Sequence, residues 1–318
     1  MNEKVPSHDD FIRSILSDKE IAVAYFQSYL PAFVRDRLDL SSLEQLPDSY
    51  LSEELRKSIS DIVYSCKLKD GKAGVKVSLL IEHKSRPDKY TPVQIGSYIF
   101  SGLQKQIQNK EPLSLIIPVL IYHGKSRWQY RTLKDLFENV DASWDKFIPG
   151  FEFVYNDLGV LSDSDIETLN NKFLAASFLA LKHSHEKEWI GQNAVQLLLL
   201  AAEGPGGLQK GFIIYLYSRG KIEENILNSL PQPLKKDVMN TLELYIEKGR
   251  KEGIQEGIQK GIQRGIEQGV EKGIEKGREE IVRNLVKSGR FTPEEIARLA
   301  GVSESFIKKV IASGGKQG

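Results

Sequence analysis

The chain has 318 residues, of which 40% are hydrophobic and 27% charged, and its formal net charge is +1. This composition is typical of a folded globular protein with one large or two smaller domains, and it excludes a binder of nucleic acid that relies on overall basicity. The single cysteine, Cys66, excludes a disulfide framework, and no apolar run reaches the roughly 18 to 20 residues that span a bilayer. The N-terminus is polar and predicts no signal peptide, so we expect a cytoplasmic location.

The first 57 residues predict two helices followed by a connector. Ser7 is suited to cap the first helix, and acids occupy its first turn. The second helix is predicted from Asp18 to Leu30. Residues 38–57 are predicted to be a connector with a short helix at 53–58. The acids of the two helices, among them Asp9, could reach a site in the domain, but capping or solvation is their expected role.

Residues 60–85 predict a β-hairpin. Its first strand is expected at 62–68 and its second at 75–84, which is rich in Val, Leu and Ile. The residues between them, KDGKAG, have the composition of a hairpin turn. If that turn is centred at 71–72, Asp61 lies opposite Glu82.

Asp61, Glu82 and Lys84 then form one patch. Side chains alternate along a strand, so Glu82 and Lys84 share a face and His83 points to the other. Two carboxylates and an ammonium suit a metal-dependent phosphodiesterase, because carboxylates are Mg²⁺ ligands and a cation steadies the attacking water or the phosphate. The alternative is a cross-strand ion pair on a solvated face, and spacing alone favours it. The apolar run at 79–81 predicts a buried strand, where charged groups are costly, and this favours a site.

The hairpin is followed by a predicted helix and two predicted strands. The helix is expected from Thr91, as its N-cap, to Asn109, with Gln94 and Tyr98 on one face. These two could orient a phosphate or a metal-bound water, or they could merely flank the apolar stripe of the helix. The strand at 113–122 is expected to be the parallel crossover partner of the second hairpin strand, and a further strand is expected at 151–155.

Three helices are predicted at 163–182, 188–202 and 208–217, as a helical cover or second subdomain without chemistry of its own. His123, at the end of the 113–122 strand, is expected to have a structural role. His183 and His185 are expected to face solvent.

Glycine recurs at every fourth position from Gly249 to Gly277, and an isoleucine or valine follows six of these glycines. A helix would place the small and the branched residues in adjacent stripes, with a right-handed wrap if two helices pair. Each glycine costs roughly 1 kcal/mol against alanine inside a helix, so an isolated helix would be marginal. We therefore expect a helix that pairs, for instance with its own copy, and a charged tether is the alternative.

The C-terminal residues predict a small helical module. Thr292 is suited to cap one helix, with Glu295 in the capping-box position, and a second helix is expected from Ser303. The segment TPEEIARLAGVSESFIKKV resembles a helix-turn-helix, in which Lys308 and Lys309 would contact phosphates. A dimerisation or packing module is the alternative.

The chain resembles the recombination-promoting nuclease family, also called YhgA-like transposases, over about Pro6 to Tyr155. The segments that carry the resemblance are PSHDDFIRSILSDKEIAVAYFQSYLP, SDIVYSCKLKDG, LLIEHKSRPD and IIPVLIYHGKSRW, in this order. The resemblance implies a PD-(D/E)XK nuclease fold that cuts DNA with a divalent metal. Ser60 stands where the first motif has its proline, and Lys84 stands where many members look to have glutamine.

What the resemblance implies for the site is specific. Asp61 corresponds to the first-motif aspartate, and Glu82 and Lys84 to the E-x-K pair. Gln94 and Tyr98 resemble the Q-x-x-x-Y element of RecB-type nucleases. We expect the two carboxylates to hold Mg²⁺ or another divalent cation, with the backbone carbonyl of His83 as a further ligand.

The sequence as a whole predicts an α/β PD-(D/E)XK core followed by an α-helical C-terminal half. The expected domains are a nuclease domain at 1–160, a helical subdomain at 161–245, the glycine-repeat helix at 246–288 and the small module at 289–318. The predicted activity is that of a Mg²⁺-dependent DNA endonuclease that promotes recombination, and the chain is expected to form homo-oligomers through the repeat. The alternatives are an inactive DNA-binding or assembly protein on the same fold and, last, a DDE-type transposase, which would need a third carboxylate.

Overall fold

The computed structural model describes residues 6–47, 62–69 and 76–314, and gives the backbone alone for residues 76–82, Glu224 and Gly314. The chain forms two compact units, one up to Ile246 and one from Glu247 on. Each unit is described by itself.

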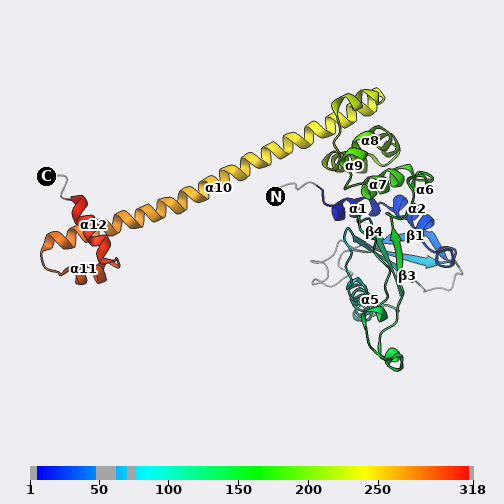
Figure 1. Cartoon of the computed structure of the whole chain (residues 1–318), viewed down its shortest axis with the longest axis horizontal. Helices are drawn as coiled ribbons and strands as arrows, with labels where there is room; N and C mark the ends of the chain where they lie inside the picture. The colour runs from blue at the N-terminus through cyan, green and yellow to red at the C-terminus, as the bar shows by residue number, and fades with distance from the viewer. Residues whose placement is uncertain (1–5, 48–61, 70–75, 315–318) are drawn as a thin grey trace. The chain divides into compact units, whose positions relative to one another are not determined.

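A five-stranded sheet with the order β1-β2-β3-β4-β5 forms the centre of the first unit (Figure 1). The first three strands are antiparallel neighbours, whereas β3, β4 and β5 run parallel. The parallel step from β3 to β4 is made by helix α5, which is the usual way to connect parallel strands. The strands are β1 (Leu38–Gln45), β2 (Ile62–Leu68), β3 (Lys76–Lys84), β4 (Leu115–Tyr122) and β5 (Val154–Asp157), and α5 spans Thr91–Gln108.

The predicted hairpin strands are confirmed in β2 and β3. Ile62 pairs with Ile81 and Val63 with Leu80, which is the register that a turn centred at 71–72 requires. The turn itself and Asp61 lie outside the described residues. The parallel pairing of β3 with β4 is also confirmed.

Strand β1 corrects the sequence analysis, which assigned residues 38–57 to a connector. Leu38, Leu40 and Leu43 are buried in the core, and the pairing of β1 with β2 shifts between Asp39 and Glu44. This bulge interrupts the period-two alternation that marks a strand in a sequence, and so it hid the strand. The short helix predicted at 53–58 lies outside the described residues.

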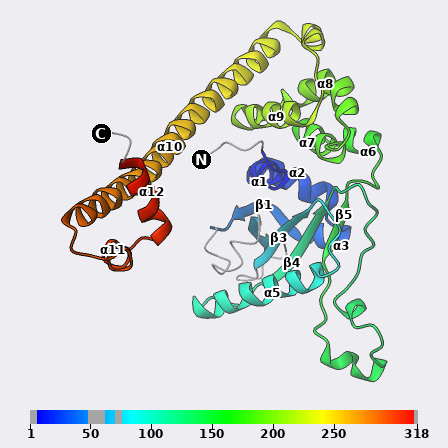
Figure 2. The ribbon, with the colours of Figure 1, turned by 60° about the vertical axis from the view of Figure 1, so that its left-hand side comes forward.

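The two faces of the sheet are covered by different helices, with α1 and α2 on one side and α5 on the other (Figure 2). Helix α1 (His8–Leu16) begins with a capping box from Ser7, as predicted, and α2 (Lys19–Tyr29) precedes a short α3 (Ala32–Arg35). The alternation of β2 follows these layers. Tyr64 and Cys66 join the core beneath α1 and α2, whereas Val63 packs with α5.

The helices after β5 pack on α1 and α2 from the side away from the sheet and continue the same core (Figure 2). Helix α7 contacts both α1 and α2, and α9 contacts α1. Phe173, Phe178 and Phe212 are fully buried in this layer. The division at 160–161 stays a prediction, and the core itself runs across it without a break. The helices are α6 (Asp163–Glu167), α7 (Lys172–Lys182), α8 (Lys187–Ala201) and α9 (Gly206–Arg219), and short 3-10 helices span Lys134–Leu136, Ala142–Phe147 and Glu224–Ser229.

The glycine repeat is helical, as predicted, within the 57-residue helix α10 (Gln232–Ser288). The small module consists of α11 (Pro293–Ala300), capped by Thr292 with Glu295 in a capping box, and α12 (Glu304–Gly314). Gly301 ends α11 with φ 61°, a left-handed conformation that favours glycine. A separate core holds this module together, formed by Val282, Ile296, Ile307 and Val310. Among the described residues, no helix is both long enough and apolar enough to cross a membrane.

Candidate functional site at the carboxyl end of β3

Lys84, the last residue of β3, is held between two polar groups. Its Nζ donates to Oε1 of Gln94 over 2.8 Å and lies 3.9 Å from Oδ2 of Asp88. Gln94 reaches the lysine because α5 starts directly after the turn that follows β3. Thr91 was expected to be the N-cap of that helix, and this was wrong. Thr91 is the first helical residue, and Tyr90 occupies the cap position without a side-chain hydrogen bond.

Tyr98 lies one turn after Gln94 and is 3% exposed. It packs with Val63 of β2 and Ile116 of β4 in a small core between α5 and the sheet. The two residues of the predicted Q-x-x-x-Y element therefore contact different parts of the protein. Gln94 meets the lysine, and Tyr98 anchors the helix against the strand that follows Asp61 in the chain.

The two predicted metal-binding carboxylates are not among the described side chains. Asp61 lies outside the described residues, and Glu82 is described by its backbone, which pairs with Leu120 of β4. Among the side chains that are described, no group of three or more His, Cys, Asp or Glu is arranged to hold a metal. The roles of Asp61 and Glu82 therefore stay predictions.

His83 lies between the predicted E-x-K residues and points to the opposite layer. Its Nδ1 is 2.6 Å from Oδ1 of Asp9 in α1. The hydrogen bond from His83 holds the pKa of Asp9 below its usual value. Asp9 thus contacts β3 from the α1 side of the sheet, through His83.

Four of the five histidines form a cluster behind this strand. The ring of His83 stacks on that of His123, with 4.8 Å between centroids, and His123 is flanked by His8 at 4.7 Å and His185 at 6.2 Å. Burial lowers the pKa of His123 to about 2 and that of His8 to about 4. The cluster therefore contains neutral rings at its centre. The Nε2 atoms of His83 and His123 have no hydrogen-bond partner among the described residues.

The histidine cluster and the burial of His183 were not predicted from the sequence. His183, expected to face solvent, is 8% exposed, and its Nε2 lies 2.9 Å from Oδ1 of Asp163. It also stacks on Trp189 with 3.6 Å between centroids. His185 is exposed, as expected. The histidines of the cluster lie far apart in the chain, so no spacing in the sequence could reveal them.

The chain was compared with known proteins. The family described as "Putative transposase, YhgA-like" matches residues 6–204, which is more than half of the chain. The recombination-promoting nuclease RpnD of Escherichia coli O157:H7 is 29% identical over 198 residues, which cover 62% of this chain and 75% of that protein.

Two relatives from Escherichia coli K12 carry contrasting names. The recombination-promoting nuclease RpnA is 24% identical over 217 residues, which cover 67% of this chain and 72% of RpnA. The inactive recombination-promoting nuclease-like protein RpnE is 27% identical over 185 residues, which cover 58% of this chain and 60% of RpnE. No solved structure matches the chain. With the family match over 6–204, the chain belongs to the YhgA-like putative transposase family, whose members include relatives named as recombination-promoting nucleases.

Proposed function

We propose that the chain is a Mg²⁺-dependent DNA endonuclease with a PD-(D/E)XK core. The observation that carries the proposal is the contact of Lys84 with Gln94 at the end of a strand that begins in an antiparallel hairpin and pairs in parallel with β4. Relatives named as nucleases support a phosphodiester substrate. The meander of β1 to β3 followed by the parallel β4 supports the fold.

The packing on the two faces of the sheet supports a common face for the three predicted catalytic residues. Val63, two residues after Asp61, packs on the α5 side, and Leu120, the partner of Glu82, packs on that side as well. Residues two apart in a strand share a face, and paired residues on neighbouring strands do too. The alternation of side chains along the two strands therefore predicts the α5 side of the sheet for the carboxylates of Asp61 and Glu82, the side on which Lys84 meets Gln94.

This chain's residues would divide the chemistry as follows. The carboxylates of Asp61 and Glu82 and the carbonyl of His83 are hard oxygen donors and would hold Mg²⁺, which supplies charge neutralisation and an activated water when bound. Lys84 would direct its ammonium at the scissile phosphate or the attacking water. The side-chain oxygen of Gln94 accepts a hydrogen bond from the ammonium, so the ammonium is already oriented before DNA binds.

The test is nicking of supercoiled plasmid in the presence of Mg²⁺. We expect Lys84→Ala or Asp61→Ala to lower the rate by a factor of about 10² to 10³ or more, because a preorganised charge at the transition state is lost. Both variants should keep the thermal unfolding temperature of the wild type. Lys210→Ala, which removes an exposed lysine of α9, is the matched control and should cleave normally.

Two outcomes would contradict this assignment. Full activity of purified Lys84→Ala or Asp61→Ala would remove these residues from the site. A wild-type protein that binds DNA but does not nick it, whichever divalent ion is added, would group the chain with the inactive relatives. It would then be a DNA-binding protein on a nuclease fold.

We propose in addition that the repeat segment of α10 binds a second copy of the chain. Its branched side chains form a stripe along the helix and are 52–62% exposed. A Cβ added at any of the adjacent glycines would meet nothing within 4 Å, so the backbone along this stripe is open to close approach by another helix. The stripe consists of Ile254, Ile258, Ile262, Ile266, Val270 and Ile274.

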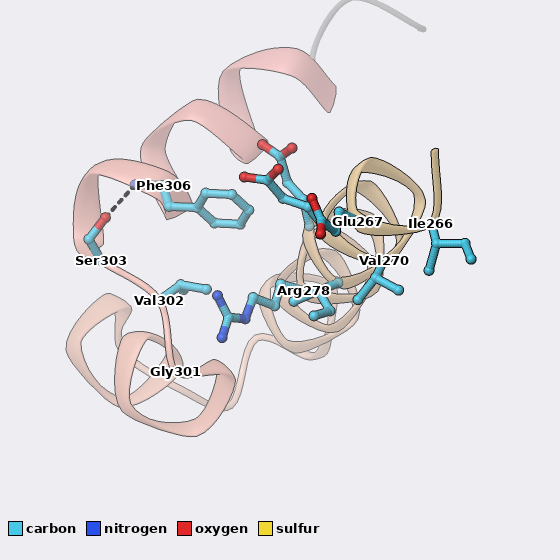
Figure 3. A pocket seen from close by; sticks show the side chains of 11 residues that line it. Ile266, Glu267, Val270, Arg278, Gly301, Val302, Ser303 and Phe306 are labelled. Carbon is cyan, nitrogen blue, oxygen red and sulfur yellow. Dashed lines mark hydrogen bonds between the residues drawn. The ribbon is translucent and has the colours of Figure 1, made fainter. Parts of the chain in front are cut away.

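The charges beside the stripe suit the same partner. In the C-terminal part of the repeat, α10 and the α11–α12 turn enclose a groove of about 810 Å³, with Val302 and Phe306 on one wall and Glu267 and Arg278 on the other (Figure 3). An acid follows each branched residue here, as Glu267 follows Ile266, and lysines such as Lys272 stand before the glycines. A second repeat carries the same alternation of acids and lysines, so opposite charges are available on both helices, which favours pairing with a copy of this helix.

The oligomeric state tests this second proposal. We expect the triple variant Ile258→Gln, Ile262→Gln and Ile266→Gln to have a lower mass than the wild type in light scattering. These side chains are exposed within one chain, so the fold should not change. The control, Leu244→Gln with Ile246→Gln, removes equally exposed apolar groups outside the repeat and should keep the wild-type mass. An unchanged mass of the triple variant would rule out pairing through this stripe.

A further inference from the structure

The loops that follow β3 and β4 leave the sheet at adjacent points. Lys84 pairs with Tyr122, and the amide of His123 donates to the carbonyl of Lys84 over 3.3 Å. At Gly124, an added Cβ would lie only 2.6 Å from the carbonyl oxygen of Ser85, so the close contact of the two loops requires a glycine. Arg86 and Lys125, the next residue of each loop, therefore start from neighbouring positions. Both are exposed.

Two more basic side chains approach the same edge from the helical layer. His185, in the loop between α7 and α8, is exposed and stacks on His123. Arg219, at the end of α9, lies over the ring of Tyr215 at 5.4 Å, and its Nη2 donates to the carbonyl of Pro6 over 2.7 Å. The hydroxyl of Tyr215 in turn lies 2.7 Å from Nδ1 of His8. The histidine cluster thus connects the strand ends to Arg219.

His185 is within electrostatic range of the three cations Arg86, Lys125 and Arg219, and of the acid Glu186. Burial lowers the pKa of His185, and the positive charges of Lys125, Arg219 and Arg86 lower it further. The charges that gather here are those of Arg86, Lys125 and Arg219 around a neutral His185 ring. Like charges repel one another, so such a group is costly unless it serves a negatively charged ligand.

The nearby acids are already engaged. Asp9 is bound by His83, and Glu186 lies 3.2 Å from Nδ1 of His183. Neither Arg86 nor Lys125 has an ion pair with an acid of the described residues. Two buried nitrogens in this region also have no hydrogen-bond partner there, Nε of Arg219 and Nε2 of His123, and the side chain of His123 is about 1% exposed. Nδ1 of His123 lies 3.1 Å from the carbonyl oxygen of Leu181 and donates to it, so Nε2 of this neutral ring is an acceptor. Nε of Arg219 is the unpaired buried donor, and such a donor marks a place that a polar ligand or water completes.

We propose that Arg86, Lys125, His185 and Arg219 form a contact for a backbone phosphodiester of double-stranded DNA beside the nuclease site. This inference rests on the proposed function in taking DNA as the substrate. Arginine and lysine are the side chains that bind phosphate oxygens, arginine through its planar fork. Phosphate contacts fix the register and orientation of a duplex without reading its sequence. The contact would place the strand to be cut across the end of β3, where Lys84 lies.

The test measures binding without cleavage. Fluorescence anisotropy with a labelled 30-base-pair duplex in EDTA, at several salt concentrations, gives the slope of log affinity against log salt. We expect the variant Arg86→Gln with Lys125→Gln to lower the magnitude of this slope by about 2, since each lost phosphate contact releases about 0.9 fewer counterions. His185→Gln with Arg219→Gln should act in the same direction. The control variant, Lys146→Gln with Lys210→Gln, removes two exposed lysines elsewhere and should keep the wild-type slope.

The outcomes separate this inference from the proposed activity. A wild-type slope in both double variants overturns the phosphate contact, whatever the plasmid assay shows. Wild-type protein that binds no duplex at any salt concentration overturns it as well. If the variants have a reduced slope and the wild type nicks no plasmid, the phosphate contact is supported and only the proposed nuclease activity is contradicted. Circular dichroism spectra equal to that of the wild type verify that each variant is folded.

Discussion

Neighbouring residues at the end of β3 serve opposite layers of the protein. Lys84 contacts Gln94 of α5, whereas His83, one residue earlier, contacts Asp9 of α1. This division follows from the alternation of side chains along a strand. Because β3 is fixed from both sides, the lysine has a defined position, which is what a group that stabilises a transition state requires.

The histidine cluster makes the folded chain sensitive to acid. In the native state the pKa of His123 is lowered from 6.5 to about 2 and that of His8 to about 4. Both groups are ordinary histidines when unfolded, so below pH 6.5 the unfolded chain binds more protons and is favoured. We expect the free energy of unfolding to be constant above about pH 7 and to fall between pH 6.5 and about pH 4.

Urea unfolding at pH 7 and pH 4.5 measures this loss. The variant His123→Phe keeps a stacked ring and removes the most strongly shifted group, so it should lose less stability over this pH interval than the wild type. Equal losses in the two proteins would mean that the acid sensitivity does not come from His123. Asp9 adds a separate loss only at lower pH, because its pKa lies below its usual value.

At the scale of elements, α10 has a sequence that disfavours the helix it forms. Its glycines cost roughly 1 kcal/mol each relative to alanine, and the branched residues beside them gain no burial within one chain. The space around every repeat glycine would nevertheless accept a methyl group. The proposed pairing with another helix would account for glycines in these positions.

The triple variant Gly257→Ala, Gly261→Ala and Gly265→Ala separates the two effects. We expect higher helicity at 222 nm, since about 1 kcal/mol of helix propensity is regained at each position. We also expect weaker self-association, because the added methyl groups keep the backbones of paired helices apart. Higher helicity with undiminished self-association would contradict the role of the glycines in close packing.

The sequence was sufficient for elements with an uninterrupted pattern and insufficient for others. The hairpin was predictable because apolar strands flank clear turn residues, and α11 because Thr292 and Glu295 form a capping box. Strand β1 was not, since its bulge breaks the alternation. The contact of Lys84 with Gln94 follows from predicted elements, whereas the cluster around His123 depends on how distant helices pack, which no local pattern records.

At the scale of the whole molecule, the sheet and the helices up to α9 share one core. Tyr25 of α2 packs against Phe178 of α7, with 5.8 Å between ring centroids, and Phe11 of α1 stacks on Tyr215 of α9 at 3.8 Å. The family match ends at residue 204, which is after α8 and just before the start of α9. The core of the first unit therefore continues into the helices that were expected to form a cover or second subdomain, and the domain boundary stays a prediction.

Truncated chains test this statement. A chain that ends at residue 160 would expose the apolar surfaces of α1 and α2 that α7 and α9 cover, and we expect it to aggregate. A chain that ends at residue 246 keeps the shared core and should unfold cooperatively, near the temperature of the full chain's main transition. Cooperative unfolding of the shorter chain, measured by calorimetry, would contradict the single core.

The four-residue period of α10 has a genetic consequence. Four residues advance a helix by about 6 Å and slightly more than one turn, so adding or deleting one tetrad keeps each stripe in line with its neighbours. One tetrad corresponds to twelve nucleotides, so its gain or loss preserves the reading frame as well as the helix. The segment can therefore gain or lose tetrads while the core of the first unit stays intact.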